Sequence, residues 1–519
     1  MSSINLTKMQ LNNNISQIGS YAFNGCTNLQ EINIPLNIQY IGNSVFYENE
    51  KITSIELPIN NTVELNNNCF SNMKGLETIT LSNNSTLGQL IFNNCLKLKK
   101  IIFGTNTKFK DSSYYLSSKH LPIETMECPE ENPHLKVLNN ALYSKDGKTL
   151  LQYPNGRKDI TTFQMPDTVE IIGRNCFFGN KQLPSIIWSQ NLKTIQQYAF
   201  SETNRNAVEF PDSLEKIEGY AFYNAKIYTI TFGSNPVNIT GNSTFYTTNY
   251  YMTREIRLKG GVEMWLNSNI NDYSVYGNTD YGCKLYLLNS NNEWEQLTEV
   301  VIPDNVTSVR NYAFYNFNLK KITLHNKITY LGNQCFRNSD ITEFFIPNSV
   351  TSLGSDTFRG CDKLTTITFE EGSTITSLPD SMCNGCTNLI AFTIPNTVTR
   401  INSSVFAGCR SLTRIDIPDS VTYIDNSCFS GAGVKKIVIG TGIQTIKSTI
   451  FGYITITDTE FVCKAIVPPT INSSTFPSSF TAANNNKIIV PTESEANYEA
   501  ATNWSTFADI IEGGAESYV

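Results

Sequence analysis

Residues that commonly carry chemistry are scarce in this sequence. The chain of 519 residues has only three histidines, His120, His134 and His325, and none belongs to an H-E-x-x-H motif or stands beside a nucleophile motif. A G-x-S-x-G motif, a phosphate-binding loop and an EF-hand loop are absent as well. The sequence therefore argues against an enzyme, and we expect no catalytic residue, no cofactor and no metal site.

Strong charge and long apolar runs are also lacking. The net charge is −7 and no basic stretch occurs, which argues against nucleic acid or an anionic membrane as a partner. No apolar run approaches the ~18 residues of a membrane span, so we expect no membrane insertion. The first residues, MSSINLTKMQLNNNISQ, have neither a basic start nor an apolar core, and they predict that this sequence has no signal peptide.

A repeat fills most of the chain. It is anchored on a phenylalanine, and neighbouring anchors lie 22 to 25 residues apart. The anchors are Phe23, Phe46, Phe70, Phe92, Phe177, Phe200, Phe222, Phe245, Phe314, Phe336, Phe358, Cys383 in place of a phenylalanine, Phe406, Phe429, Phe451 and Phe476. A fixed period in this range is typical of a solenoid, in which stacked units bury a face that no single unit can bury alone.

Each unit reads I-G-x-x-A-F-x-x-C-x-x-L-x-x-I-x-I-P and continues through a turn to V-x-x-I. In the copy around Phe406, the alternation up to Ile417 predicts a strand with one buried face, and Pro418 ends it. The Asp or Asn that follows such prolines is expected to bond the backbone two residues on. A second short strand is expected at 398–401. The segment SSVFAGC predicts one helical turn that places Phe406 and Cys409 on the same inner side.

The repeat resembles the BspA-like leucine-rich repeat, also called the Treponema pallidum type, over most of residues 15–451. This resemblance implies a leucine-rich-repeat solenoid of short β-strands with single helical turns, right-handed, curved and elongated. Asn139–Pro154 reads as a hairpin turning at Asp146-Gly147. Lys487–Gly513 resembles the closing segment of such proteins. Residues 497–511, with Tyr498, Trp504, Phe507, Ile510 and Ile511, are expected to cap the last coil.

The pattern divides the chain into six segments. They are N-terminal repeats at 1–103, a divergent segment with the hairpin at 104–165, repeats at 166–245, a degenerate aromatic-rich segment at 246–300, repeats at 301–451 and a capping region at 452–519. The interval from Phe245 to Phe314 is 69 residues, or three units of 23, so degenerate coils are expected there.

Thirteen cysteines raise the alternatives of disulfides or a metal site. Ten of them occupy repeat positions, either three after an anchor, just before it or in its place; only Cys128, Cys283 and Cys463 lie outside these. Cys383 and Cys386 form a single C-x-x-C without the second pair that a zinc site needs. We therefore expect reduced cysteines that act as small hydrophobic residues in the core.

The degenerate segment is rich in aromatic residues among Asn, Asp and Gly. Tyrosine and tryptophan are enriched at recognition sites because they give rigid area with a polar handle. This composition suggests a binding site at Tyr250, Tyr251, Trp265, Tyr273, Tyr276 and Tyr281. The alternative is that degenerate coils bury these rings. The outward strand positions, such as Thr368, Arg414 and Asp416, form either a solvated face or a shallow binding surface.

The resemblance implies a non-enzymatic recognition or adhesion protein at the cell surface or outside the cell, with a host or neighbouring-cell protein or glycan as partner. Two alternatives remain at this point. One is a phage or virion protein that recognises a host, which the absence of a leader favours. The other is a structural spacer.

Overall fold

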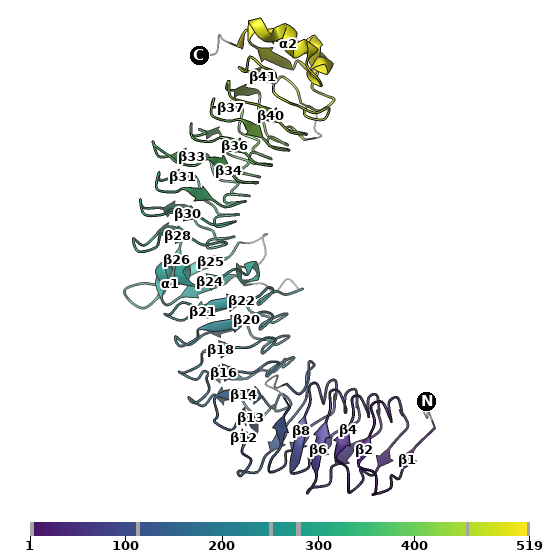
Figure 1. Cartoon of the computed structure of the whole chain (residues 1–519). Helices are drawn as coiled ribbons and strands as arrows, with labels where there is room; N and C mark the ends of the chain where they lie inside the picture. The colour runs from purple at the N-terminus through teal and green to yellow at the C-terminus, as the bar shows by residue number, and fades with distance from the viewer. Residues whose placement is uncertain (1–4, 111–114, 249–252, 277–281, 453–455, 516–519) are drawn as a thin grey trace. The chain divides into compact units, whose positions relative to one another are not determined.

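The computed structural model describes residues 5–110, 115–248, 253–276, 282–452 and 456–515. Its contacts divide the chain into two compact units, Met1–Thr253 and Arg254–Val519. Each unit is a stack of coils, and most coils contribute two short strands that pair in parallel with the same strands of the adjacent coils (Figure 1). The chain is thus a solenoid built mainly of short strands, as the repeat predicted.

Two rows of strands run along the first unit. One row comprises β1 (Lys8–Met9), β3 (Glu31–Ile32), β5 (Ser54–Glu56), β7 (Thr78–Thr80), β9 (Lys100–Ile102), β11 (Thr125–Glu127), β15 (Thr162–Gln164), β17 (Ser185–Ile187), β19 (Ala207–Glu209) and β21 (Thr229–Phe232). The other comprises β2 (Gln17–Ile18), β4 (Tyr40–Ile41), β6 (Thr62–Leu65), β8 (Asn84–Leu87), β10 (Lys108–Phe109), β12 (Leu135–Leu138), β13 (Ala141–Ser144), β14 (Thr149–Gln152), β16 (Ile171–Ile172), β18 (Thr194–Ile195), β20 (Lys216–Glu218) and β22 (Asn238–Thr240).

The second unit repeats this arrangement. Its first row comprises β23 (Glu255–Leu258), β25 (Lys284–Leu288), β26 (Trp294–Leu297), β27 (Glu299–Val301), β29 (Lys321–Thr323), β31 (Glu343–Ile346), β33 (Thr366–Phe369), β35 (Ala391–Phe392), β37 (Arg414–Ile417), β39 (Lys436–Ile439), β41 (Glu460–Cys463), β42 (Lys487–Val490) and β43 (Ile511–Gly513). Its second row comprises β24 (Asn269–Ile270), β28 (Ser308–Val309), β30 (Tyr330–Leu331), β32 (Ser352–Leu353), β34 (Ser377–Leu378), β36 (Arg400–Ile401), β38 (Tyr423–Ile424) and β40 (Thr445–Ile446). The helices are α1 (Gly261–Asn267), η1 (Tyr273–Tyr276), η2 (Ala482–Asn484), η3 (Thr492–Ser494), α2 (Glu495–Ala500) and η4 (Trp504–Ile510).

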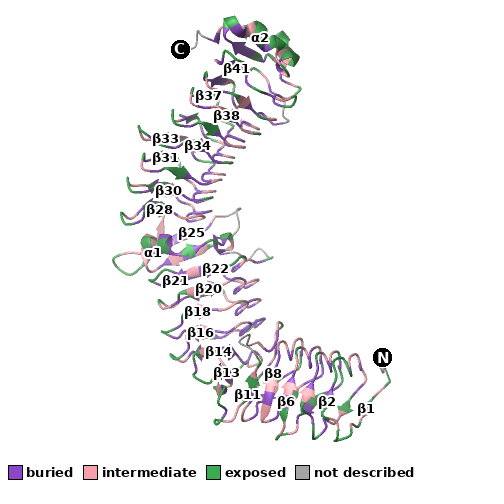
Figure 2. Ribbon diagram, in the orientation of Figure 1, coloured by how far each residue is buried: buried purple, intermediate pink, exposed green. Residues whose placement is uncertain are grey.

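The strand register stacks like residues on like. Ile415 in β37 lies beside Ile437 in β39, and Ile401 in β36 lies beside Ile424 in β38. These isoleucines are buried, whereas Asp416 between the buried positions of β37 is exposed. Burial therefore alternates along the strands, as Figure 2 shows by colour.

The segment around each anchor is a hydrogen-bonded turn and not a helical turn, which corrects the expectation. Ser404, Phe406 and Gly408 donate their backbone N–H groups to the next coil, at distances of 2.7–3.0 Å. Ser404 has a φ of 59° and Gly408 a φ of 72°. The left-handed backbone conformation of these two residues, one on either side of the anchor, turns every second N–H group toward the neighbouring coil. The N–H groups of Ala407 and Cys409 bond within the turn to the carbonyl oxygens of Ser404 and Phe406, both at 3.2 Å.

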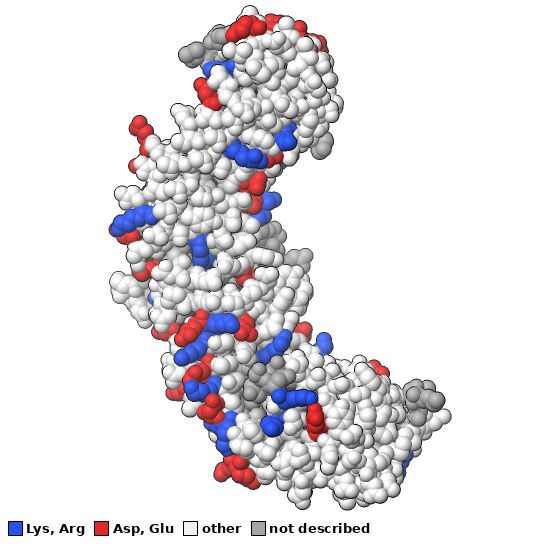
Figure 3. All heavy atoms as spheres, viewed as in Figure 1, with Lys and Arg blue, Asp and Glu red and all other residues white. Residues whose placement is uncertain are grey.

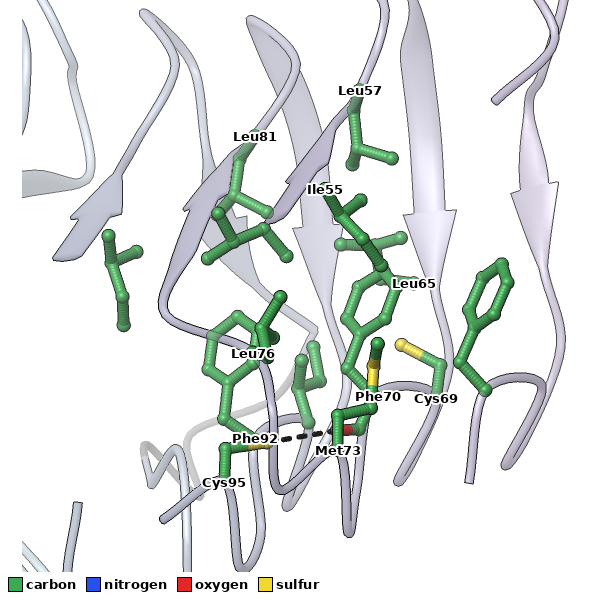
Figure 4. Packing of buried hydrophobic residues seen from close by; sticks show 14 of the residues in the cluster. Ile55, Leu57, Leu65, Cys69, Phe70, Met73, Leu76, Leu81, Phe92 and Cys95 are labelled. Carbon is green, nitrogen blue, oxygen red and sulfur yellow. Dashed lines mark hydrogen bonds between the residues drawn. The ribbon is translucent and has the colours of Figure 1, made fainter. Parts of the chain in front are cut away.

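The anchors form ladders of stacked rings inside each unit. Phe23 and Phe46 stack with ring centroids 5.7 Å apart, and Phe406 and Phe429 do the same at 5.7 Å. Figure 4 shows part of this core in the first unit, with Phe70 and Phe92 beside the leucines and isoleucines of the strands. Contacts of this kind tie each coil to its direct neighbours.

Polar side chains also bond between coils. Asp212 accepts the backbone N–H of Ser234 at 2.7 Å, and Asp419 accepts that of Thr441 at 2.7 Å. We expected these Asx residues to bond within their own turn. They instead bond 22 residues on, because the next turn lies directly beside them in the stack.

Two segments depart from the repeat. Within 139–154, strands β13 and β14 pair antiparallel around a turn in which Gly147 donates its N–H to Ser144 at 2.8 Å. Near the C-terminus, α2 and η4 lie against the last coils (Figure 1). The Tyr498 hydroxyl donates to the carbonyl oxygen of Ala465 at 2.7 Å, and the Trp504 indole N–H donates to that of Pro469 at 2.8 Å. Both rings are buried.

Candidate recognition surfaces

The structure separates the six aromatic residues that the sequence suggested as a binding site. Tyr250, Tyr251 and Tyr281 lie outside the described residues. Trp265 and Tyr276 are fully buried. Tyr273 is 53% exposed, and its role in binding stays a prediction. The expectation of exposed rings is therefore corrected at Trp265 and Tyr276.

The burial of these two rings has a clear cause. The Trp265 indole N–H donates to the carbonyl oxygen of Ala313 at 2.7 Å, and the guanidinium of Arg310 lies 4.6 Å from the Trp265 ring. Arg310 Nη1 also donates to the Tyr276 hydroxyl at 2.9 Å. Tyr276 packs edge-on against Phe317 at 5.7 Å. The two rings thus fill the core of coils that have no anchor phenylalanine of their own.

A shallow groove crosses five adjacent coils of the second unit, over β33, β35, β37, β39 and β41. Three hollows make it up, of about 440, 700 and 700 Å³, and neighbouring hollows share lining residues. The first two share Thr393, Ile394 and Asn396, and the last two share Asp419 and Lys464. We call this continuous feature the strand groove. It includes Thr368, Arg414 and Asp416, three outward positions that the sequence considered for a binding surface.

Outward polar side chains line the middle of the strand groove. Ile394, Ile415 and Ile417 also border it, but their side chains are buried in the core. On the wall, Arg414 donates from Nε and Nη2 to the two carboxylate oxygens of Asp416, at 3.0 and 2.8 Å. These hydrogen bonds raise the pKa of the Arg414 guanidinium. The pair is therefore held in a fixed geometry at the solvent surface.

Exposed apolar side chains mark one end of the groove. Ile466 is 60% and Val467 is 76% exposed, and both line the hollow nearest the C-terminal helices. Ile390, 58% exposed, lines the middle hollow. Large apolar side chains gathered at one hollowed surface are typical of interaction sites. Sequence reasoning missed Ile466 and Val467, although the run KAIVPPT breaks the repeat and follows a strand directly.

Charged side chains on the strands are largely paired with the adjacent coil. Lys436 bonds Glu460 at 2.7 Å, and Lys487 bonds Glu512 at 3.0 Å. Arg400 bonds Asp425 at 2.8 Å. In Figure 3 the basic and acidic atoms lie next to one another along the coils. The strand face therefore offers little charge of a single sign to a partner.

The cysteines are free, and twelve of the thirteen are buried. Burial raises the pKa of the Cys95 thiol and of the Cys428 thiol to about 12. Cys95 Sγ donates to the carbonyl oxygen of Phe70 at 3.0 Å (Figure 4). The described residues hold no group of three or more Cys, His, Asp or Glu side chains arranged to bind a metal ion. These thiols therefore serve the core, and they add hydrogen bonds that the sequence did not reveal.

Comparison with known proteins supports the same architecture. A family model described as "BspA type leucine rich repeat region" matches residues 1–120, 155–264, 290–410 and 376–492, which together span most of the chain. No curated protein matches the sequence.

Three crystal structures are similar to this chain. A leucine-rich repeat protein from Bacteroides ovatus has 18% identity and a TM-score of 0.45, over 74% of this chain and 90% of its own. A leucine-rich cell surface protein from Faecalibacterium prausnitzii has 20% identity and a TM-score of 0.24, over 83% and 78%. The pneumococcal vaccine antigen PcpA has 17% identity and a TM-score of 0.33, over 77% and 74%.

Proposed function

Since the chain belongs to the BspA-type leucine-rich repeat family, we propose that it is a non-enzymatic recognition or adhesion protein that binds a protein or glycan partner on a cell surface. Repeat solenoids present long, rigid surfaces, and proteins of this architecture use them for binding. The same proposal places the protein at the cell surface or outside the cell. In the described ranges, no helix is long and apolar enough to cross a bilayer.

The strand groove is the observation that carries this proposal. It extends over five coils and is lined by outward polar side chains such as Thr368, Arg414 and Asp416. A small metabolite would be enclosed in a deeper pocket, whereas a shallow groove of this length suits a chain-like or surface partner. The exposed Ile466 and Val467 add an apolar contact at one end.

A matched pair of variants tests the proposal. Beads coated with the wild-type chain are applied to cultured epithelial cells and to bacterial cells, and beads coated with albumin measure the background. Ile466→Asp places a charge in the groove, at a side chain that is 60% exposed. Ile59→Asp is the control, because Ile59 is 61% exposed and lies in a turn of the first unit. We expect specific adhesion by the wild type and the control, and reduced adhesion by Ile466→Asp.

Two results would count against the proposal in different ways. Wild-type beads that adhere no better than albumin beads to any of the cells would contradict an adhesion function. Equal adhesion by Ile466→Asp and Ile59→Asp would remove the strand groove as the binding surface. Melting temperatures of both variants show whether a loss of adhesion reflects loss of fold.

A further inference from the structure

We propose that Tyr198, Tyr220, Tyr223 and Tyr246 in the first unit form a second contact surface, and that it binds a protein partner with a neutral contact face. We call these four residues the tyrosine grid. The proposal rests on the recognition function proposed above, and it names the partner class at a surface separate from the strand groove.

The grid is an ordered array of rings on three consecutive anchor turns. Tyr198 and Tyr220 stack with centroids 5.2 Å apart and planes 16° apart. Tyr223 and Tyr246 stack at 5.8 Å and 21°. Tyr220 and Tyr223 join the two pairs through an edge contact at 5.8 Å. Each tyrosine is half-buried, so the rings are held in place while part of each reaches solvent.

A cation extends the array by one coil. The guanidinium of Arg174 lies 6.0 Å from the Tyr198 ring and 5.0 Å from the Tyr115 ring. Arg174 also donates from Nη2 to Gln197 Oε1. Side chains fixed in this way lose little conformational entropy when a partner binds, and this pre-organisation favours affinity.

Two of the grid tyrosines occupy a turn position at which the backbone has positive φ. Tyr198 and Tyr220 stand two residues before an anchor, with φ values of 59° and 62°. Some other coils place Asn68, Asn175 or Ser404 at this position, and others place Tyr21, Tyr312 or Leu90 there. Asparagine tolerates the left-handed region, whereas a bulky aromatic residue there is strained. Tyrosine thus recurs at this turn position outside the grid, and what distinguishes Tyr198 and Tyr220 is that their rings stack in adjacent coils.

The surroundings of the grid favour a neutral protein partner. Lys181 Nζ donates to the carbonyl oxygen of Glu202, and Lys216 pairs with Glu218 at 2.9 Å. These two lysines are thus bonded within the protein, which favours a partner with a neutral contact face over a nucleic acid or an acidic glycan. Tyrosine beside amides and small polar residues is the composition that protein-binding surfaces use at their hot spots.

Ring packing also bears on the choice between protein and sugar. Tyr220, one coil later, covers one face of Tyr198, and Arg174, one coil earlier, lies over the same ring. A sugar ring stacks best on a free aromatic face. Ring edges and hydroxyl groups instead suit the backbone carbonyls and side chains of a protein. A glycan is the competing class, and the experiment below separates the two.

The test uses the full chain and three variants in the bead assay with epithelial and bacterial cells. Tyr198→Asn/Tyr220→Asn removes two grid rings and substitutes a residue that tolerates positive φ. Tyr21→Asn is the matched control, because Tyr21 has a φ of 64° at the same turn position but lies in the first coil, 62% exposed. Ile466→Asp reports on the strand groove in parallel. Cells are also treated with protease or with periodate, which oxidises glycans.

We expect the double variant to adhere about 30-fold less tightly, as for the loss of a hot-spot residue. Its melting temperature should stay unchanged or rise because strain is relieved, and Tyr21→Asn should adhere like the wild type. Protease treatment of the cells should abolish adhesion, and periodate should not.

Three results would overturn the tyrosine grid. They are full adhesion by the double variant, a melting temperature several degrees below that of Tyr21→Asn, and adhesion that is lost after periodate but not after protease. The first of these together with a loss in Ile466→Asp leaves the proposed recognition function standing. Absence of specific adhesion by the wild type contradicts the proposed function itself.

Discussion

The Cys361 thiol donates a hydrogen bond to the carbonyl oxygen of Phe336, 25 residues earlier, at a distance of 3.1 Å from sulfur to oxygen. This bond joins two adjacent coils inside the core. Cys409 makes the equivalent bond to the carbonyl oxygen of Cys383 at 3.2 Å. Ser339 occupies the same place in its coil and donates to Phe314 at 3.2 Å. In these three coils the position three after the anchor thus places a small side-chain donor beside the anchor carbonyl of the preceding coil.

This relationship predicts an unusual ranking of substitutions at Cys361. A thiol that only fills space would be replaced better by alanine than by serine, because a buried hydroxyl costs free energy without a partner. Since Phe336 offers an acceptor, we expect Cys361→Ser to have a free energy of unfolding about 0.5–1.5 kcal/mol higher than that of Cys361→Ala. Urea unfolding of both variants measures the difference. Greater stability of the alanine variant would show that the hydrogen bond contributes nothing.

Thiol reactivity provides a second prediction. Burial raises the pKa of the Cys95 and Cys428 thiols to about 12, so very little of their reactive thiolate exists at pH 8. Cys128 is the half-buried exception, and burial raises its pKa to about 11. We expect Ellman's reagent without reductant to label the native protein slowly, with Cys128 reacting first, and to find thirteen thiols after unfolding. Fewer thiols in the unfolded chain would reveal disulfides.

The anchor phenylalanines should dominate local stability. Phe406 is fully buried, stacks on Phe429 and meets the ring edge of Phe392 at 4.9 Å. Phe406→Ala should therefore lower the free energy of unfolding by about 3–5 kcal/mol. Phe345→Ala is the control, because Phe345 is 50% exposed on a strand of the same unit. Hydrogen exchange should locate the loss in the coils next to Phe406, and equal effects of the two variants would contradict the assigned core.

The core could be predicted from the sequence because the period constrains it. Most coils supply an anchor, a small residue three later and an alternating strand, so Phe406, Cys409 and Ile415 can be recognised from their spacing. All three are buried. The conformation of the anchor turn could not be predicted from the sequence, because every second backbone N–H group of the turn bonds to another coil. A pattern read within one unit predicts a helical turn, whereas Ser404 and Gly408 adopt positive φ to reach the next coil.

Surface sites were harder to predict from the sequence than the core, because they also depend on contacts between coils. Outward positions vary freely from coil to coil, and their meaning depends on which residues the stack brings side by side. Tyr198 and Tyr220 are 22 residues apart and unremarkable in the sequence, yet their rings stack. Conversely, Trp265 belongs to an aromatic-rich segment that suggested a binding site, and Arg310 and Ala313 hold it in the core. Composition alone does not distinguish these two outcomes.

His120 predicts a pH dependence of stability. Burial lowers the pKa of its imidazole below the ordinary 6.5, and the nearby Lys181 charge lowers it further, against the opposing effect of a backbone hydrogen bond with Phe178. The unfolded chain therefore binds a proton more readily than the folded chain. The stabilisation is present above pH 6.5 and is lost as the pH falls below that value. We expect the melting temperature to decrease from pH 7 to pH 5, and less steeply in His120→Leu. Parallel curves for the two proteins would exclude His120 as the cause.

The last prediction separates the two roles left to the degenerate segment. Trp265 is fully buried and bonded to Ala313, so Trp265→Ala should lower the free energy of unfolding by about 3–5 kcal/mol. Tyr273 is 53% exposed, so Tyr273→Ala should leave the melting temperature nearly unchanged. If Tyr273 contacts a partner, Tyr273→Ala beads should adhere less to cells while the protein stays folded. Unchanged adhesion would restrict the segment to its role in the core, and a marked loss of stability in Tyr273→Ala would show that its ring packs against the coil in solution.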